Sequence, residues 1–67
     1  MDPNATLAAI RGHLAEIERL DALIALGDER SDEYEARDDT ALDCARLVKD
    51  LDDWIRAGGF PPDEWVR

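Results

Sequence analysis

Apolar residues recur every three or four positions along most of this 67-residue chain, and that spacing is typical of amphipathic helices. In the first part of the chain the apolar stripe comprises Leu7, Ile10, Leu14, Ile17 and Ile24, widened by Leu20, Leu23 and Leu26. In the second part it comprises Tyr34, Ala41, Cys44, Ala45, Val48, Leu51, Trp54 and Ile55. The chain is therefore predicted to be all-α, with two long helices.

Capping residues define the first predicted helix. Asp2 can cap the N-terminus with its carboxylate, and Pro3 suits the first helical position because an N–H group has no partner there. Asn4 and Thr6 are alternative caps. Gly27 favours the left-handed conformation that commonly follows a helix. The first helix is therefore expected over residues 3–26, followed by a turn over residues 27–31.

The second helix is expected over residues 32–57, because the sequence "AGGFPP" then combines a glycine pair with a proline pair. Glycine can end a helix in the left-handed conformation, and proline prevents its continuation. The predicted fold is an antiparallel two-helix hairpin, a single helical domain over residues 1–67, with a C-terminal clasp over residues 58–67. One helix running through Gly27, in an extended coiled coil, is the alternative.

A chain this short has little core of its own, because small domains bury only part of their surface. Cys44 is the only cysteine and His13 the only histidine, so neither an internal disulfide nor a His/Cys zinc site is expected. The first helix, however, has more apolar residues than one contact stripe requires. The surplus comprises Leu20, Leu23, Ile24 and Leu26. These residues predict a homo-oligomer, with a dimer that forms a four-helix bundle as the first choice.

The chain is strongly acidic, with 17 acidic and 8 basic residues and a net charge of −9. Residues 28–43 contain eight acids and two bases, a net charge of 2 − 8 = −6. The acidic patch predicted there comprises Asp28, Glu29, Asp32, Glu33, Glu35, Asp38 and Asp39. This charge repels nucleic-acid phosphates and anionic membranes, so neither is an expected partner.

Both tryptophans and the only phenylalanine lie around the chain breakers near the C-terminus. Trp54 falls near the end of the second predicted helix, Phe60 follows the glycine pair, and Trp65 follows the proline pair. An apolar residue just past a helix-ending glycine often packs back on the last turn, which predicts an aromatic clasp at one end of the hairpin. The other interpretation is an exposed anchor for a partner protein, since tryptophan is enriched at binding hot spots.

The segment "LDDWIRAGGFPPDEW", residues 51–65, resembles the ending of many short helical proteins of actinobacteria and their phages. Those proteins often end in Leu-Asp-x-Trp, followed by Gly-Gly-Phe, a proline and a second tryptophan. The matching residues are Leu51, Asp52, Trp54, Gly58, Gly59, Phe60, Pro62 and Trp65. The resemblance implies a source and a size class, but no particular activity.

Catalysis is not expected, because catalytic carboxylates need a cleft that perturbs their pKa and a helical hairpin has little room for one. No cofactor or metal is expected either. The predicted function is a small acidic, non-enzymatic protein–protein interaction or structural module, such as a phage accessory protein. The alternative is an acidic inhibitor that mimics nucleic acid and acts on a host or defence protein.

The expected location is the cytoplasm, or the host cytoplasm or the virion if a phage encodes the protein. No apolar run approaches the ~20 residues that span a bilayer. The first twelve residues, "MDPNATLAAIRG", lack the basic and apolar regions of a signal peptide.

Overall fold

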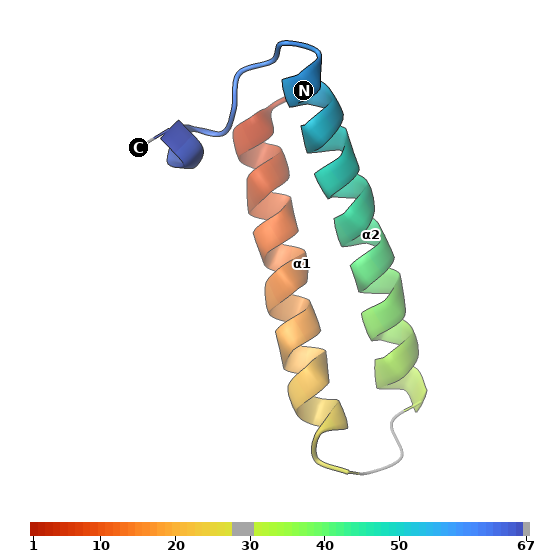
Figure 1. Cartoon of the computed structure of the whole chain (residues 1–67). Helices are drawn as coiled ribbons and strands as arrows, with labels where there is room; N and C mark the ends of the chain where they lie inside the picture. Colours follow the sequence, from red (N-terminus) through yellow and green to blue (C-terminus); the bar gives the residue numbers. More distant parts are fainter. Residues whose placement is uncertain (28–30, 67) are drawn as a thin grey trace.

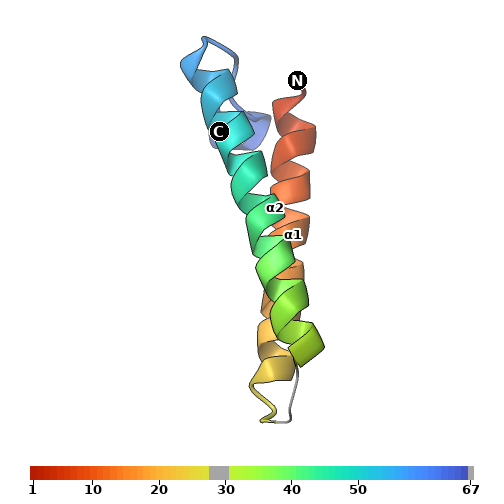
Figure 2. The same cartoon turned by 90° about the vertical axis from the view of Figure 1, so that its right-hand side faces the viewer.

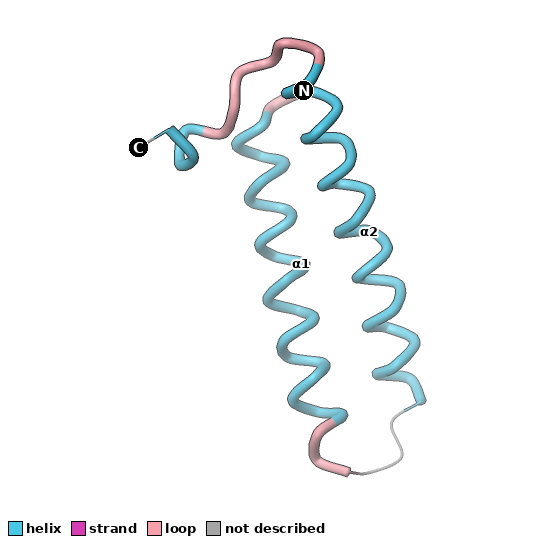
Figure 3. Tube along the Cα trace, viewed as in Figure 1, coloured by secondary structure: helices cyan, strands magenta, loops and turns pink. Residues whose placement is uncertain are grey.

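The computed structural model describes residues 1–27 and 31–66, and it confirms an all-α helical hairpin (Figure 1). Helix α1 spans Pro3–Ile24, helix α2 spans Ser31–Arg56, and a short 3-10 helix, η1, spans Asp63–Val66. The two long helices lie side by side and run in opposite directions (Figures 1 and 2). A loop leads from the end of α2 across the start of α1 to η1 (Figure 3).

Helix α1 begins as its sequence predicts. The Asp2 carboxylate accepts hydrogen bonds from the backbone N–H groups two and three residues further on, at 3.0 and 3.2 Å, and Pro3 is the first helical residue. The helix ends at Ile24 rather than at the predicted Leu26. The chain tightens there, because Gly27, at a φ of +85°, donates its N–H to the Ile24 carbonyl at 3.2 Å.

A Schellman motif ends α2, and it explains the first glycine of the pair. Gly58 has a left-handed φ of +99°. Its N–H donates to the Ile55 carbonyl at 3.0 Å, and the Gly59 N–H donates to the Trp54 carbonyl at 2.9 Å. These are the two hydrogen bonds that define the motif. Helix α2 therefore ends at Arg56, one residue before its predicted end.

The hairpin is a single layer with a small core. Its extents are 46 × 21 × 13 Å, so it is little thicker than one helix (Figure 2). The central cluster comprises the buried Ile10, Cys44 and Leu51, with the partly buried Leu47, Trp54 and Ile55 around them. Each long helix therefore packs mainly on the side that faces its neighbour.

The rotation of α1 corrects one prediction. Leu20 was expected to face another chain, but it is 3% exposed in the hairpin. The reason is the next residue, Asp21, whose carboxylate stays at the edge of the interface and accepts a hydrogen bond from Arg37 at 2.8 Å. This rotation keeps the charged group out of the core, which would penalise it, and directs Leu20 inward. Leu14, seven residues before Asp21 and on the same side of the helix, is consequently 47% exposed.

Candidate functional site

The C-terminal clasp starts with a contact between two aromatic rings. The rings of Trp54 and Phe60 meet edge to face, with 5.7 Å between their centroids and an interplanar angle of 85°. The Trp54 Nε1–H also donates a hydrogen bond to the Phe60 carbonyl at 2.9 Å. Phe60 thus packs back on the last turn of α2, as its position after the glycine pair predicts.

The second glycine of the pair leaves room for the indole ring. A Cβ atom on Gly59 would lie 2.5 Å from Cδ2 of Trp54 and closer still to Cε2 and Nε1 of the same ring. The chain can therefore pass over the face of Trp54 only if residue 59 has no side chain.

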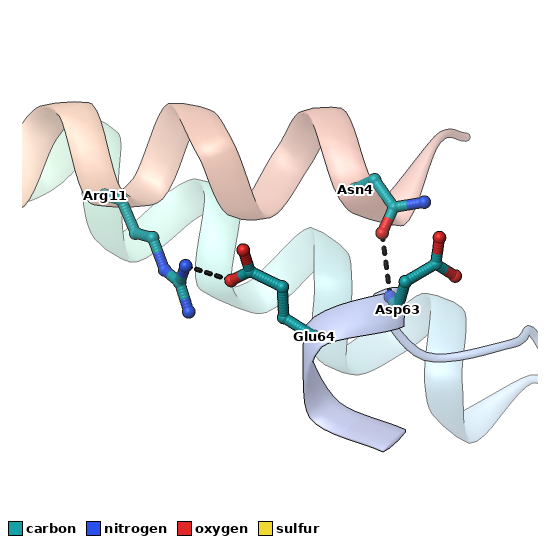
Figure 4. A network of polar contacts seen from close by, with 4 residues as sticks. All are labelled: Asn4, Arg11, Asp63 and Glu64. Carbon is teal, nitrogen blue, oxygen red and sulfur yellow. Dashed lines mark hydrogen bonds and ion pairs between the residues drawn. The ribbon is translucent and has the colours of Figure 1, made fainter. Parts of the chain in front are cut away.

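Two polar contacts hold the C-terminal segment against α1 (Figure 4). The Asp63 backbone N–H donates to Oδ1 of Asn4 at 2.8 Å, and the Glu64 carboxylate forms an ion pair with Arg11. Pro62, just before η1, is fully buried. These contacts place η1 beside the first turns of α1 (Figures 1 and 4).

This arrangement places Trp65 at an apolar groove on the hairpin. The groove has a volume of about 270 Å³ and is lined by Leu7, Ile10, Val48, Leu51, Asp52, Ile55 and Trp65. Trp65 itself remains 53% exposed. Trp65 therefore lines the groove and also presents about half of its surface to solvent, and its role as an anchor for a partner protein stays a prediction.

Exposed apolar side chains continue from the groove along the same broad side of the hairpin. Leu14 lies one helical turn beyond Ile10, and Val48, on the rim of the groove, is 50% exposed. The exposed Ala45 and Ala41 lie three and seven residues before Val48, on the same side of α2. The Trp65 face is defined here as Leu14, Ala41, Ala45, Val48 and Trp65.

A charged cluster marks the end of the Trp65 face nearest the turn. Nη1 of Arg37 lies 2.8 Å from Oδ1 of Asp21, and Cζ of Arg37 lies 5.2 Å from the centre of the Tyr34 ring. The hydrogen bond that Arg37 donates to Asp21 raises the pKa of Arg37. Asp21 therefore pairs across the hairpin and links the two helices at the edge of their interface.

The predicted oligomer stripe lies largely within the hairpin. Leu20 is buried, and Leu23 and Ile24 are half-buried, while Leu26, beyond the end of α1, is exposed. On the Trp65 face, by contrast, Leu14, Val48 and Trp65 are exposed. Sequence reasoning placed Leu14 and Val48 in the stripes and missed their exposure. A charged residue within a stripe, here Asp21, was the available signal that α1 is rotated.

The acidic patch is only partly within the described residues, since Asp28 and Glu29 lie outside them. Glu33 is half-buried at the interface side of α2. The remaining predicted members, Asp32, Glu35, Asp38 and Asp39, are exposed on the solvent side of the first turns of α2. These four carboxylates thus form a solvated, negatively charged surface.

The described carboxylates with perturbed pKa values are suited to structure rather than to proton transfer. A hydrogen bond from Lys49 lowers the pKa of Asp53, and one from Arg19 lowers the pKa of Glu16. Both groups are therefore anionic near neutral pH, whereas a general acid or base needs a pKa close to the working pH. Within residues 1–27 and 31–66, His, Cys, Asp and Glu side chains form no cluster of three or more that could hold a metal ion.

None of the described helices has the length and apolar character needed to cross a membrane. Comparison of the chain with protein-family models, curated proteins and solved structures gives no match. The surfaces described above are therefore the basis for a functional assignment.

Proposed function

We propose that this chain is a small, acidic, non-enzymatic interaction module that binds another protein surface through the Trp65 face. The observation that carries the proposal is the half-exposed Trp65 at the rim of an apolar groove, with Leu14 and Val48 exposed beside it. Contiguous exposed apolar surface on a soluble protein marks a contact site, and tryptophan is a frequent anchor in such sites.

The composition of the face supports binding rather than chemistry. Among the described residues that line the groove, Asp52 alone is charged, and its carboxylate lies 3.7 Å from Arg56. The other lining groups supply apolar surface and shape, which favour an apolar protein partner.

The C-terminal sequence supports a biological setting for the module. Its resemblance to the endings of short actinobacterial and phage proteins fits an accessory protein of such a source, acting in the cytoplasm or in the virion. This setting requires no cofactor, membrane or nucleic acid as a partner.

Affinity capture with matched variants tests the proposal. Tagged wild type, Leu14→Asp and Val48→Asp are compared with Leu42→Asp in extracts of the cells that produce the protein. Leu42 is a suitable control because it lies on α2 outside the Trp65 face and is 51% exposed. A protein, either untagged chain or another, should be retained by wild type and Leu42→Asp and lost by both face variants. The same retained proteins with all four baits would contradict the proposal.

A second candidate function, mimicry of nucleic acid, is favoured by the exposed acids of α2. Glu35, Asp38 and Asp39 are exposed. Asp38 and Asp39 follow Glu35 by three and four residues, which places their Cβ atoms about 5–6 Å from that of Glu35 on a helix. A basic groove of a DNA-binding protein is complementary to such charge.

Competition with duplex DNA tests this candidate. Wild type should release DNA from a DNA-binding host protein in a salt-sensitive manner, and the Glu35→Gln/Asp38→Asn/Asp39→Asn variant should not. Equal behaviour of the two proteins would exclude mimicry through this surface.

A further inference from the structure

We propose that the surface bound by the Trp65 face is the Trp65 face of a second copy of this chain, packed antiparallel in a two-fold symmetric four-helix bundle. The inference rests on the proposed function, since it names the partner of the same face. The size and thickness of the hairpin support this dimer, as do the side chains at the middle of the face and its charges.

The hairpin is too extended and too thin for a compact domain of its length. The radius of gyration is 14.6 Å. A compact domain of this length has a radius of gyration of about 11 Å, and a chain of twice the length about 14 Å. Stable domains consist of at least two packed layers, whereas the hairpin is a single layer 13 Å thick. A second hairpin on one broad side supplies the missing layer.

The area of the broad side matches what a dimer needs. The extents of 46 × 21 Å enclose the broad side in a rectangle of about 970 Å². A stable interface of standard size buries about 800 Å² on each partner. A second copy is therefore large enough to form an ordinary interface, and it covers the groove, Leu14 and Val48 together.

The middle of the Trp65 face has a large residue beside small ones. Leu14 is near the middle of α1, and Ala41 and Ala45 are near the middle of α2. A two-fold axis across the helices at this level stacks α1 on α1 and α2 on α2 of the other copy, so the two Leu14 side chains meet close to the axis. Ala41 and Ala45 beside them leave room for these larger side chains, which allows the two helical layers to interdigitate.

The charges favour the antiparallel orientation. Asp52 lies at the end of the face near the clasp, whereas Arg37 lies at the end near the turn. An antiparallel pair brings Asp52 of each copy toward Arg37 of the other. A parallel pair instead places the two Asp52 side chains at the same end of the dimer, together with the two Trp65 side chains. The two Asp52 carboxylates then repel each other, which is unfavourable in a chain that already has a net charge of −9.

Sedimentation equilibrium of the full chain and three variants tests the inference. Wild type and Leu42→Asp should form the dimer over concentrations of about 1 μM to 1 mM. Leu14→Asp and Val48→Asp should each weaken the dimer by about tenfold or more, because two-fold symmetry introduces every substitution twice. Circular dichroism separates loss of the dimer from loss of the fold, since folded monomeric variants keep the helical spectrum.

The orientation has its own readout, which leaves the residues of the Trp65 face unchanged. A spin label on Tyr34→Cys, in a Cys44→Ser background, sits about ten residues from the middle of α2. The antiparallel dimer should therefore place the two labels about 30 Å apart, at 1.5 Å per residue. A separation below about 20 Å would indicate the parallel dimer and overturn the proposed orientation.

Two results would overturn the inference as a whole. One is a wild-type monomer throughout the concentration range, and the other is a dimer weakened equally by Leu42→Asp and the face variants. A monomer whose Trp65 face still captures a different protein would leave the proposed function standing, so the two failures are distinguishable.

Discussion

Gly58 and Gly59 are adjacent, but they are required for different physical reasons. Gly58 has a φ of +99°, in the left-handed region that disfavours residues with a Cβ atom. Gly59 is needed for space, because its backbone passes directly over the Trp54 ring. The glycine pair and the aromatic residues therefore form one structural unit, in which the glycines allow the rings of Trp54 and Phe60 to meet.

Substitution of Gly59 by alanine should destabilise the fold, whereas the same substitution at Gly12 should not. Gly59→Ala is expected to cost about 1–3 kcal/mol, since the Trp54 ring must move away from the new methyl group. Gly12→Ala is the matched control, because nothing lies within 4 Å of its added Cβ. It is expected to stabilise helix α1 by about 0.5–1 kcal/mol. Thermal unfolding followed by circular dichroism measures both, and equal effects of the two substitutions would contradict the described clasp.

The C-terminal segment is held by fewer and weaker contacts than the helices. Its polar anchors, the Arg11–Glu64 pair and the bond from Asp63 to Asn4, are solvent-exposed. Exposed ion pairs contribute about 0–1 kcal/mol. Trp65 therefore depends mainly on its contact with the groove, while Trp54 combines packing, the contact with Phe60 and a hydrogen bond.

This difference predicts an order for the two tryptophan substitutions. Trp54→Ala should lower the free energy of unfolding by about 3 kcal/mol, near the lower end of the range for aromatic core residues. Trp65→Ala should lower it by about 1–2 kcal/mol, because only half of the side chain is buried. Chemical denaturation in dilute solution measures both values. A larger loss for Trp65→Ala would mean that the segment is a principal part of the fold.

The ion pair between Lys49 and Asp53, with 2.6 Å between Nζ and Oδ2, should make α2 sensitive to pH. Because this pair lowers the pKa of Asp53, its contribution to stability is complete above the unfolded-state pKa of about 3.9 and is lost as pH falls through the folded-state value. Lys49→Met should therefore destabilise the protein at about pH 7, by an amount that shrinks as the pH falls through the folded-state pKa of Asp53. Arg46→Met, which removes a 3.7 Å pair with Asp43, should have a smaller effect at neutral pH. A destabilisation by Lys49→Met that is independent of pH would show that the pair is not its cause.

Capping and helix-ending residues predicted the helix boundaries well. They did not determine how α1 is rotated about its own axis. Asp2, Pro3 and Gly58 act on their immediate neighbours, so their positions gave the start of α1 and the end of α2 to within one residue. Which residues of a wide stripe face the neighbouring helix depends instead on a contact across the hairpin. The pair of Asp21 with Arg37 decides it, burying Leu20 and exposing Leu14.

As a whole, the molecule is a flat, elongated hairpin whose core holds few buried side chains. Its apolar surface is uneven, because Leu14, Val48 and Trp65 are exposed around a single groove, while the exposed acids of α2 point into solvent elsewhere. The charged surface and the exposed apolar surface of the Trp65 face thus lie on different sides of one short chain. Self-association through the Trp65 face is the central claim that follows from this shape.

Light scattering of the wild-type chain across a hundredfold dilution series tests that claim most directly. The mass of one chain is 7.5 kDa. We predict a mass of twice this value at the concentrated end of the series, with dissociation toward the single chain only on dilution. A mass of 7.5 kDa at every concentration would contradict self-association and leave the Trp65 face for a different protein.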